Sequence, residues 1–118
     1  MAPDRFRVAQ IRRIAVAHMR LWAVPAPLVE DGQLVVSELV TNSIEHGHGA
    51  VLLRMRRTES QLRIEVTDEN SAPAQLRHAD DEDLCGRGLF LVASLADVWG
   101  VSRDGRTTWA SFTLPGES

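Results

Sequence analysis

Apolar residues recur every three or four positions over the first part of the chain, a spacing that predicts an amphipathic helix with one buried face. They are Val8, Ile11, Ala15, Met19 and Trp22. Asp4 can cap the start of this helix near Arg5. Two prolines in residues 23–32 interrupt the pattern, and a second helix is expected from there to about His46, where Gly47 favours a stop.

The period of the pattern changes from that of a helix to that of a strand after residue 49. Residues 50–57 and 61–68 alternate apolar and polar side chains on either side of the segment Thr-Glu-Ser, which predicts an antiparallel hairpin. Residues 98–104 and 107–114 predict a second pair of strands, with a turn at Asp104-Gly105.

A long loop and a third helix are expected between the two pairs of strands. Residues 69–85 have no period, and loops of this length often form lids or binding segments. Gly86 then opens a helical pattern. Strands adjacent to strands predict one α/β domain over residues 1–118, a two-layer sandwich with a mixed, mainly antiparallel sheet and helices on one face.

Composition and charge narrow the class of protein. A chain of 118 residues with 44% hydrophobic and 25% charged residues fits one soluble globular domain. The net charge of −3 argues against direct binding to nucleic acid. The single cysteine, Cys85, excludes an intrachain disulfide and a four-thiolate zinc site. No apolar run predicts a membrane span or a signal peptide, so a cytoplasmic location is expected.

Three stretches could carry chemistry. Glu38 and Asn42 lie one turn apart on one helical face, although asparagine is a poor helix former. Asp68 ends an otherwise apolar strand. The turn Gly86-Arg87-Gly88 starts a helix, whose free N–H groups suit a phosphate. Taken singly, these stretches are more simply explained as a solvated helix face, a turn-forming acid and an ordinary glycine turn.

In this order the three stretches resemble the ATP-binding site of the GHKL fold. The segments SELVTNSIEHG, VTDENSAP, GRGLFLVASLADVWG and GRTTWASF resemble its anti-sigma regulatory factor branch, the actinobacterial-type serine/threonine kinases. The resemblance covers about Phe6 to Leu114. It implies that this chain has the fold of the family and uses ATP and Mg²⁺ as cofactors.

The resemblance also implies a role for each matching residue. Glu38 resembles the general base that activates the attacking hydroxyl, and Asn42 resembles the asparagine that binds Mg²⁺. Asp68 resembles the acid that accepts a hydrogen bond from the adenine amino group, and Thr107 resembles the threonine that supports this acid. The phosphate-binding turn is matched by Gly86, Arg87, Gly88 and Leu89. Arg87 suits either a phosphate contact or solvent.

The implied function is an ATP-binding, anti-sigma factor-like regulator with protein serine/threonine kinase activity. It would bind a sigma factor and phosphorylate an antagonist protein on serine, without contacting nucleic acid or membrane, and a homodimer is compatible with this scheme. Residues 69–73 lack the glycines that the broader superfamily carries after the adenine-binding aspartate. An alternative therefore stays open, a binding module that regulates its partner by sequestration with little or no catalysis.

Overall fold

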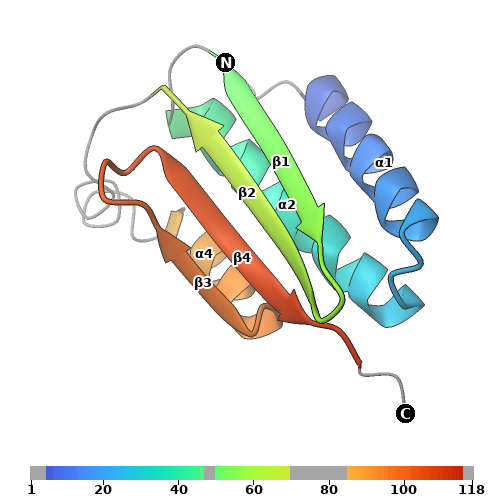
Figure 1. The fold of residues 1–118 in the computed structure, drawn as a ribbon. Helices are drawn as coiled ribbons and strands as arrows, with labels where there is room; N and C mark the ends of the chain where they lie inside the picture. The colour runs from blue at the N-terminus through green and yellow to red at the C-terminus, as the bar shows by residue number, and fades with distance from the viewer. Residues whose placement is uncertain (1–4, 47–49, 70–84, 116–118) are drawn as a thin grey trace.

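The computed structural model describes residues 5–46, 50–69 and 85–115, in which helices cover one face of a four-stranded sheet (Figure 1). The helices are α1 (Arg5–Leu21), α2 (Ala26–His46) and α4 (Cys85–Leu95). The strands are β1 (Val51–Arg57), β2 (Gln61–Asp68), β3 (Val98–Val101) and β4 (Thr107–Thr113). Their order along the chain is the predicted one. No helix within the described ranges is long and apolar enough to cross a membrane.

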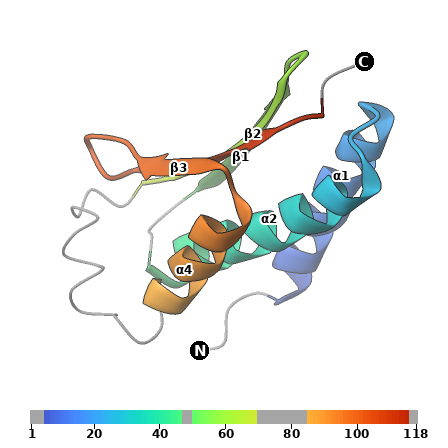
Figure 2. The same ribbon diagram turned by 90° about the horizontal axis from the view of Figure 1, so that it is seen from below.

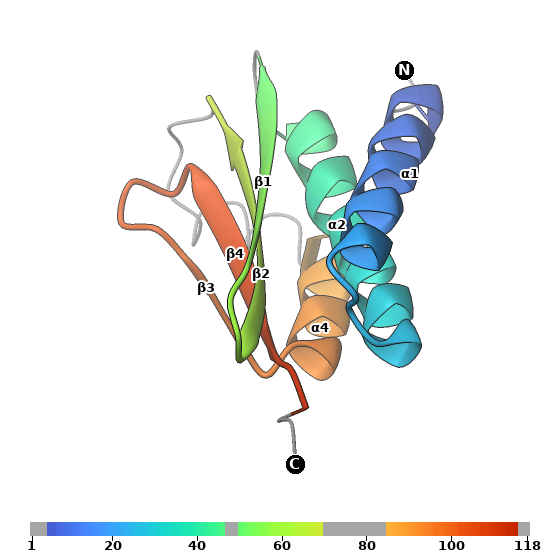
Figure 3. The same ribbon diagram turned by 45° about the vertical axis from the view of Figure 1, so that its right-hand side comes forward.

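The order of strands across the sheet is β1-β2-β4-β3. Each neighbouring pair is antiparallel, so the parallel component of the predicted mixed sheet does not occur among the described strands. The hairpin of β3 and β4 folds back so that β4 lies beside β2. All the described helices lie on the same side of this sheet, and no described element covers its other face (Figures 2 and 3).

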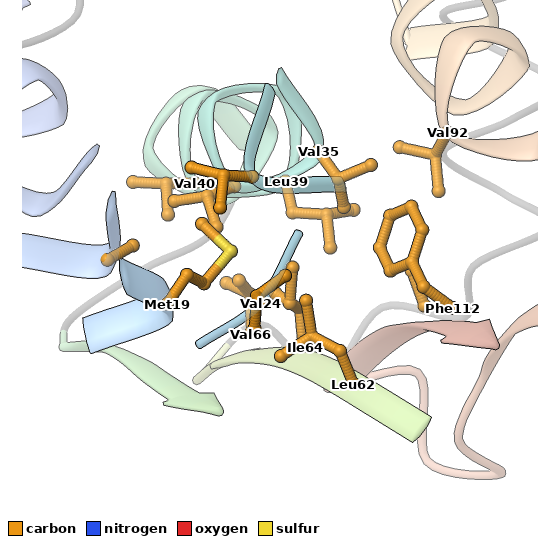
Figure 4. Close-up of a cluster of buried hydrophobic side chains, with 14 of the residues drawn as sticks. Met19, Val24, Val35, Leu39, Val40, Leu62, Ile64, Val66, Val92 and Phe112 are labelled. Atoms are coloured by element: carbon orange, nitrogen blue, oxygen red, sulfur yellow. The ribbon is translucent and has the colours of Figure 1, made fainter. Parts of the chain in front are cut away.

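The hydrophobic core lies between α2 and the middle of the sheet (Figure 4). Its largest fully buried side chains are Phe112, Met19, Leu39, Leu62, Ile64, Val35, Val36, Val40, Val66 and Val92. The predicted stripe of α2 is buried at Val36 and Val40 and half-buried at Ile44, and Val35 and Leu39 widen it. The stripe is wide because α2 packs against α1, α4 and the sheet together.

Alternation along β2 sorts its side chains between the two faces of the sheet. Leu62, Ile64, Val66 and Asp68 are buried, whereas the residues between them are partly exposed. Because successive side chains of a strand point to opposite faces, Asp68 lies on the helix-covered face. Arg63, Glu65 and Thr67 lie on the uncovered face.

The turn between β3 and β4 is held by side-chain hydrogen bonds. Ser102 Oγ donates to Asp104 Oδ1 at 2.6 Å, and the backbone N–H of Arg106 donates to the same oxygen at 3.0 Å. These bonds, the one from Ser102 first, lower the pKa of Asp104 from its usual value. Gly105 has a φ of 74°, which suits glycine, so β4 begins at a defined position.

The end of α1 contains an unusual backbone conformation at Ala23, whose φ is 58°. The N–H of Val24 donates to the carbonyl of Met19 and the N–H of Ala23 to that of Arg20, the pattern of a Schellman motif. Glycine normally occupies the left-handed position of this motif, because a Cβ there costs about 1–2 kcal/mol.

Ala23→Gly is therefore expected to raise the free energy of unfolding, by about 0.5–1 kcal/mol once the greater entropy of an unfolded glycine is subtracted. Urea unfolding followed by circular dichroism measures the change. The matched control is Ala17→Gly on the exposed side of α1, where the same substitution should destabilise by about 1 kcal/mol. Equal losses in both variants would contradict the prediction.

Candidate functional site

Four chain segments meet at one end of the molecule. The carboxyl ends of α2 and β2 lie there with the amino ends of α4 and β4 (Figures 1 and 2). α2 packs against α4 on one side and against β2 below. The segments that carry Glu38 and Asn42, Asp68 and the glycine turn are therefore brought to the same region, although up to about 50 positions separate them in the chain.

Asp68 is the last residue of β2 and is only 4% exposed. Its backbone N–H donates to the carbonyl of Arg106 at 2.9 Å, which fastens the end of β2 to the residue before β4. Burying a carboxylate is costly unless hydrogen bonds compensate for the lost water. Asp68 is therefore a buried carboxylate at the end of a core strand and differs from the exposed acid of an ordinary turn.

Glu38 and Asn42 are both half-buried, at the border between the core stripe of α2 and the surface. Ser37 contacts α1, because Nη1 of Arg12 lies 3.5 Å from its Oγ. Successive helical residues are about 100° apart, so Glu38 and Asn42 face about 100° and 140° away from Ser37. They therefore point away from α1, and neither is the fully solvated residue of an ordinary polar helix face.

The glycine turn lies at the amino end of α4, which begins at Cys85, one residue before the predicted start. Leu89 is half-buried, and its side chain packs against the hydrophobic core and so anchors the start of α4 there. The side chains of Cys85 and Arg87 fall outside the described residues, and so do residues 70–84 of the predicted loop, with its acidic run 80–83. The two alternatives for Arg87, a phosphate contact or exposure to solvent, therefore both stay open.

Thr107 contacts a different partner from the expected one. Its Oγ1 lies 2.8 Å from Oγ1 of Thr67, its cross-strand neighbour, on the uncovered face of the sheet. Asp68 lies on the opposite face, so the contact of the Thr107 hydroxyl with Thr67 is distinct from the predicted support of Asp68. Thr107 instead stabilises the pairing of the ends of β2 and β4, and its role toward adenine stays a prediction.

With this geometry in place, comparison with known families identifies the domain. The model of the histidine kinase-like ATPase domain matches residues 1–113. The chain belongs to this family. Its antiparallel sheet with helices on one face is consistent with the GHKL-type fold, so the predicted fold is confirmed. No curated protein matches the chain.

Membership in the histidine kinase-like ATPase family implies that the domain binds ATP. It does not distinguish the anti-sigma branch from the other branches of the superfamily, which leaves that part of the sequence-based prediction as a proposal.

The Mg²⁺ that the resemblance implies requires few ligands from the protein. No cluster of three or more histidine, cysteine, aspartate or glutamate residues that could hold a metal occurs in the described ranges. Mg²⁺ needs no such cluster, because it is usually held by one or two protein oxygens, several waters and the phosphates of the nucleotide. The amide oxygen of Asn42 is suited to be that protein ligand.

Thr108 is a candidate site residue that the sequence-based reasoning missed. It is half-buried and pairs with Val66 across β2 and β4, on the same face as Asp68. The signal was present in the alternation of β4, where Ala110, Phe112 and Leu114 are buried. Even-numbered residues of this strand therefore face the helices, and Thr108 is in phase with them.

Proposed function

We propose that this domain is an ATP- and Mg²⁺-dependent protein serine/threonine kinase of the anti-sigma regulatory type, which binds a sigma factor and phosphorylates an antagonist protein. The observation that carries the proposal is that the carboxyl end of β2, which ends at the buried Asp68, lies beside the carboxyl half of α2, which contains the half-buried Glu38 and Asn42 (Figure 1). The match to the histidine kinase-like ATPase family supports the ATP-binding part of it.

Asp68 would provide the selectivity for adenine. An ionised carboxylate accepts a hydrogen bond from the 6-amino group of adenine, and such charge-assisted bonds are stronger than neutral ones. Guanine has a carbonyl oxygen in that position, which would repel the carboxylate. The backbone bond from Asp68 to Arg106 holds the acid at the end of β2, so little reorganisation is needed when the base enters.

Asn42 and the start of α4 would hold the phosphates. Asn42 would provide one oxygen ligand to Mg²⁺, which neutralises the charge of the phosphates when it is bound. The free N–H groups and the positive end of the helix dipole at Gly86 to Gly88 suit the phosphate oxygens. No side chain is required in this turn, which is compatible with two glycines there.

Glu38 would act as the general base for phosphoryl transfer. It takes the proton of the serine hydroxyl as the serine oxygen bonds to the γ-phosphorus and the bond to the bridging oxygen of ADP breaks. The protein contributes mainly positioning and electrostatics to such a reaction. The product phosphoserine carries about −1.5 to −2 charge, which would change the docking of the antagonist.

Calorimetric titration with ATP, with and without Mg²⁺, tests the proposal at its first step. We expect saturable binding of ATP that is tighter with Mg²⁺, and weaker binding of GTP under the same conditions. Absence of heat and of a thermal shift at millimolar ATP would instead favour the module that acts by sequestration. The reason to consider that module is that residues 69–73 lack the glycines of the broader superfamily.

Asn42→Ala is expected to lower the affinity for ATP in the presence of Mg²⁺ by about 10-fold or more, the scale of losses seen around metal sites. Affinity in the absence of Mg²⁺ should stay within about 3-fold of the wild type, because the substituted group acts through the ion. Glu30→Ala, an exposed position near the start of α2 and about three turns away from Asn42, is the matched control. Unchanged affinity with Mg²⁺ would remove Asn42 from the site.

A further inference from the structure

The sheet face turned away from the helices carries a cluster of arginines around one tryptophan. We call the residues Arg54, Arg56, Arg63, Glu65 and Trp109 the outer basic face. Arg54 and Arg56 of β1 pair with Glu65 and Arg63 of β2, and Glu65 in turn pairs with Trp109 of β4. No described helix or strand covers these side chains (Figure 3).

The centre of the outer basic face is held in one arrangement. Nε of Arg63 lies 2.6 Å from Oε2 of Glu65, and the guanidinium carbon of Arg63 lies 4.3 Å from the ring centre of Trp109. The indole extends over Gly100 of β3, where an added Cβ would lie 2.8 Å from its Cζ2 atom. Glycine at that position lets the ring lie close to the sheet, so Trp109 and Arg63 form a rigid platform.

The charges of the outer basic face are not arranged for stability. Arg56 lies directly opposite Arg63, and like charges in that position are destabilising. Glu65 lies opposite Arg54, but its ion pair is with Arg63. Among the described residues, no acidic side chain forms an ion pair with Arg54 or Arg56, and both are exposed.

Protection of an edge strand accounts for only part of this arrangement. β1 is an edge strand, and charged side chains on an edge prevent unwanted pairing with other chains. Charges of alternating sign would give the same protection without placing Arg56 against Arg63. Local arrangements that cost stability are expected mainly where function requires them.

We infer that the outer basic face docks an acidic segment of a partner protein, a second interaction surface on the sheet face opposite the ATP-binding residues of α2. Carboxylates of the partner would pair with Arg54 and Arg56 and relieve the repulsion between Arg56 and Arg63. Arginine and tryptophan are the residue types enriched where binding energy concentrates in interfaces.

Charge selects this occupant over two others. Two copies of the chain placed face to face would bring their Arg54 and Arg56 side chains together, which like-charge repulsion opposes. A nucleic acid requires a broadly basic surface, whereas this chain has a net charge of −3. An acidic protein segment meets the local positive charge without requiring a basic chain.

The spacing of the arginines defines a probe. Arg54 and Arg56 are two residues apart on one strand, about 6.6 Å, the distance between alternate residues of any extended segment. A synthetic peptide of alternating glutamate and threonine is titrated into the ¹⁵N-labelled full chain, with alternating glutamine and threonine as the control peptide. We expect saturable shifts at the indole N–H of Trp109 and along β1, β2 and β4 with the acidic peptide only.

Charge reversal then locates the binding. The double variant Arg54→Glu with Arg56→Glu should bind the acidic peptide about 10-fold or more weakly than the wild type. Both arginine–carboxylate pairs with the peptide are lost, and repulsion replaces them. Arg13→Glu with Arg20→Glu on α1 makes the same change in net charge at exposed positions and should weaken binding of this peptide by less than about 3-fold. Arg56→Gln should bind the acidic peptide more weakly than the wild type, because one positive charge is lost. It should unfold at no lower temperature, because the repulsion between Arg56 and Arg63 is removed.

Four outcomes of the binding and unfolding measurements, and one of sedimentation, would overturn the inference. The four are equal weakening by the two charge-reversed pairs, equal binding of the glutamine peptide, tighter binding of a DNA duplex with the same shifts, and marked destabilisation by Arg56→Gln. A wild-type dimer in sedimentation that Arg54→Glu with Arg56→Glu converts to a monomer would assign the outer basic face to a second copy instead.

Discussion

Glu38→Gln is expected to lower the rate of phosphoryl transfer to the cognate antagonist by about 100- to 10,000-fold, the usual contribution of a general base. Glu38 is half-buried one helical turn before Asn42, so it would lie near the phosphate that the metal holds. Glutamine keeps the shape and polarity of the side chain but cannot take the proton of serine. Affinities for ATP and for the protein partners should therefore stay close to those of the wild type.

A radiolabelled phosphotransfer assay, paired with ATP titration on the same preparation, measures both quantities. Glu45→Gln is the matched control, because Glu45 lies two turns along on the same side of α2 and is exposed. Its transfer rate should match the wild type. A normal rate in Glu38→Gln would show that Glu38 is not the base. A wild type that transfers phosphate to no antagonist would favour sequestration.

Asp68→Asn is expected to weaken ATP binding by about 10- to 100-fold, the loss of one hydrogen bond to a charged group. The amide is a poorer acceptor than the carboxylate, and it can donate to the carbonyl of guanine. The difference in affinity between ATP and GTP should therefore narrow. Calorimetric titration with both nucleotides measures this change, and thermal unfolding measures the effect on stability, which should be the smaller of the two.

Glu69→Gln is the control for Asp68→Asn, because it makes the same chemical change at the next residue. Glu69 is exposed, and its carboxylate accepts a hydrogen bond from the backbone N–H of Ala50 at 3.3 Å. Its substitution should leave nucleotide affinity unchanged within about 2-fold, since exposed ion and hydrogen-bond contacts contribute little. An Asp68→Asn variant that melts early but binds ATP normally would identify Asp68 as a structural acid.

The sequence was sufficient for the helices and strands because their signals are local. The period of about 3.6 over α1 and α2 and the period of 2 over β1 and β2 are properties of consecutive residues. The same holds for the turn at Asp104-Gly105, whose φ of 74° at Gly105 follows from residue types at adjacent positions. The acid at the end of β2 and the glycines before Leu89 could be recognised for the same reason, as short motifs in a fixed order.

The partners of these side chains depended on the tertiary structure. The resemblance implies that Thr107 supports Asp68, a role that stays a prediction, whereas its contact with Thr67 became visible only from the register of β2 against β4. A shift of one residue in a strand exchanges the two faces. The partner of each residue follows from the pairing of β2 with β4, two strands that are distant in the chain.

The outer basic face shows the same limit. Arg63 and Trp109 are 46 positions apart, and the contact between them follows from the strand order β1-β2-β4-β3. By itself, then, the sequence determined the elements, the ATP-binding family and the candidate residues, all of which are encoded in local patterns. The tertiary structure decided which residues meet across the sheet, because strand order and pairing join segments that are distant in the chain.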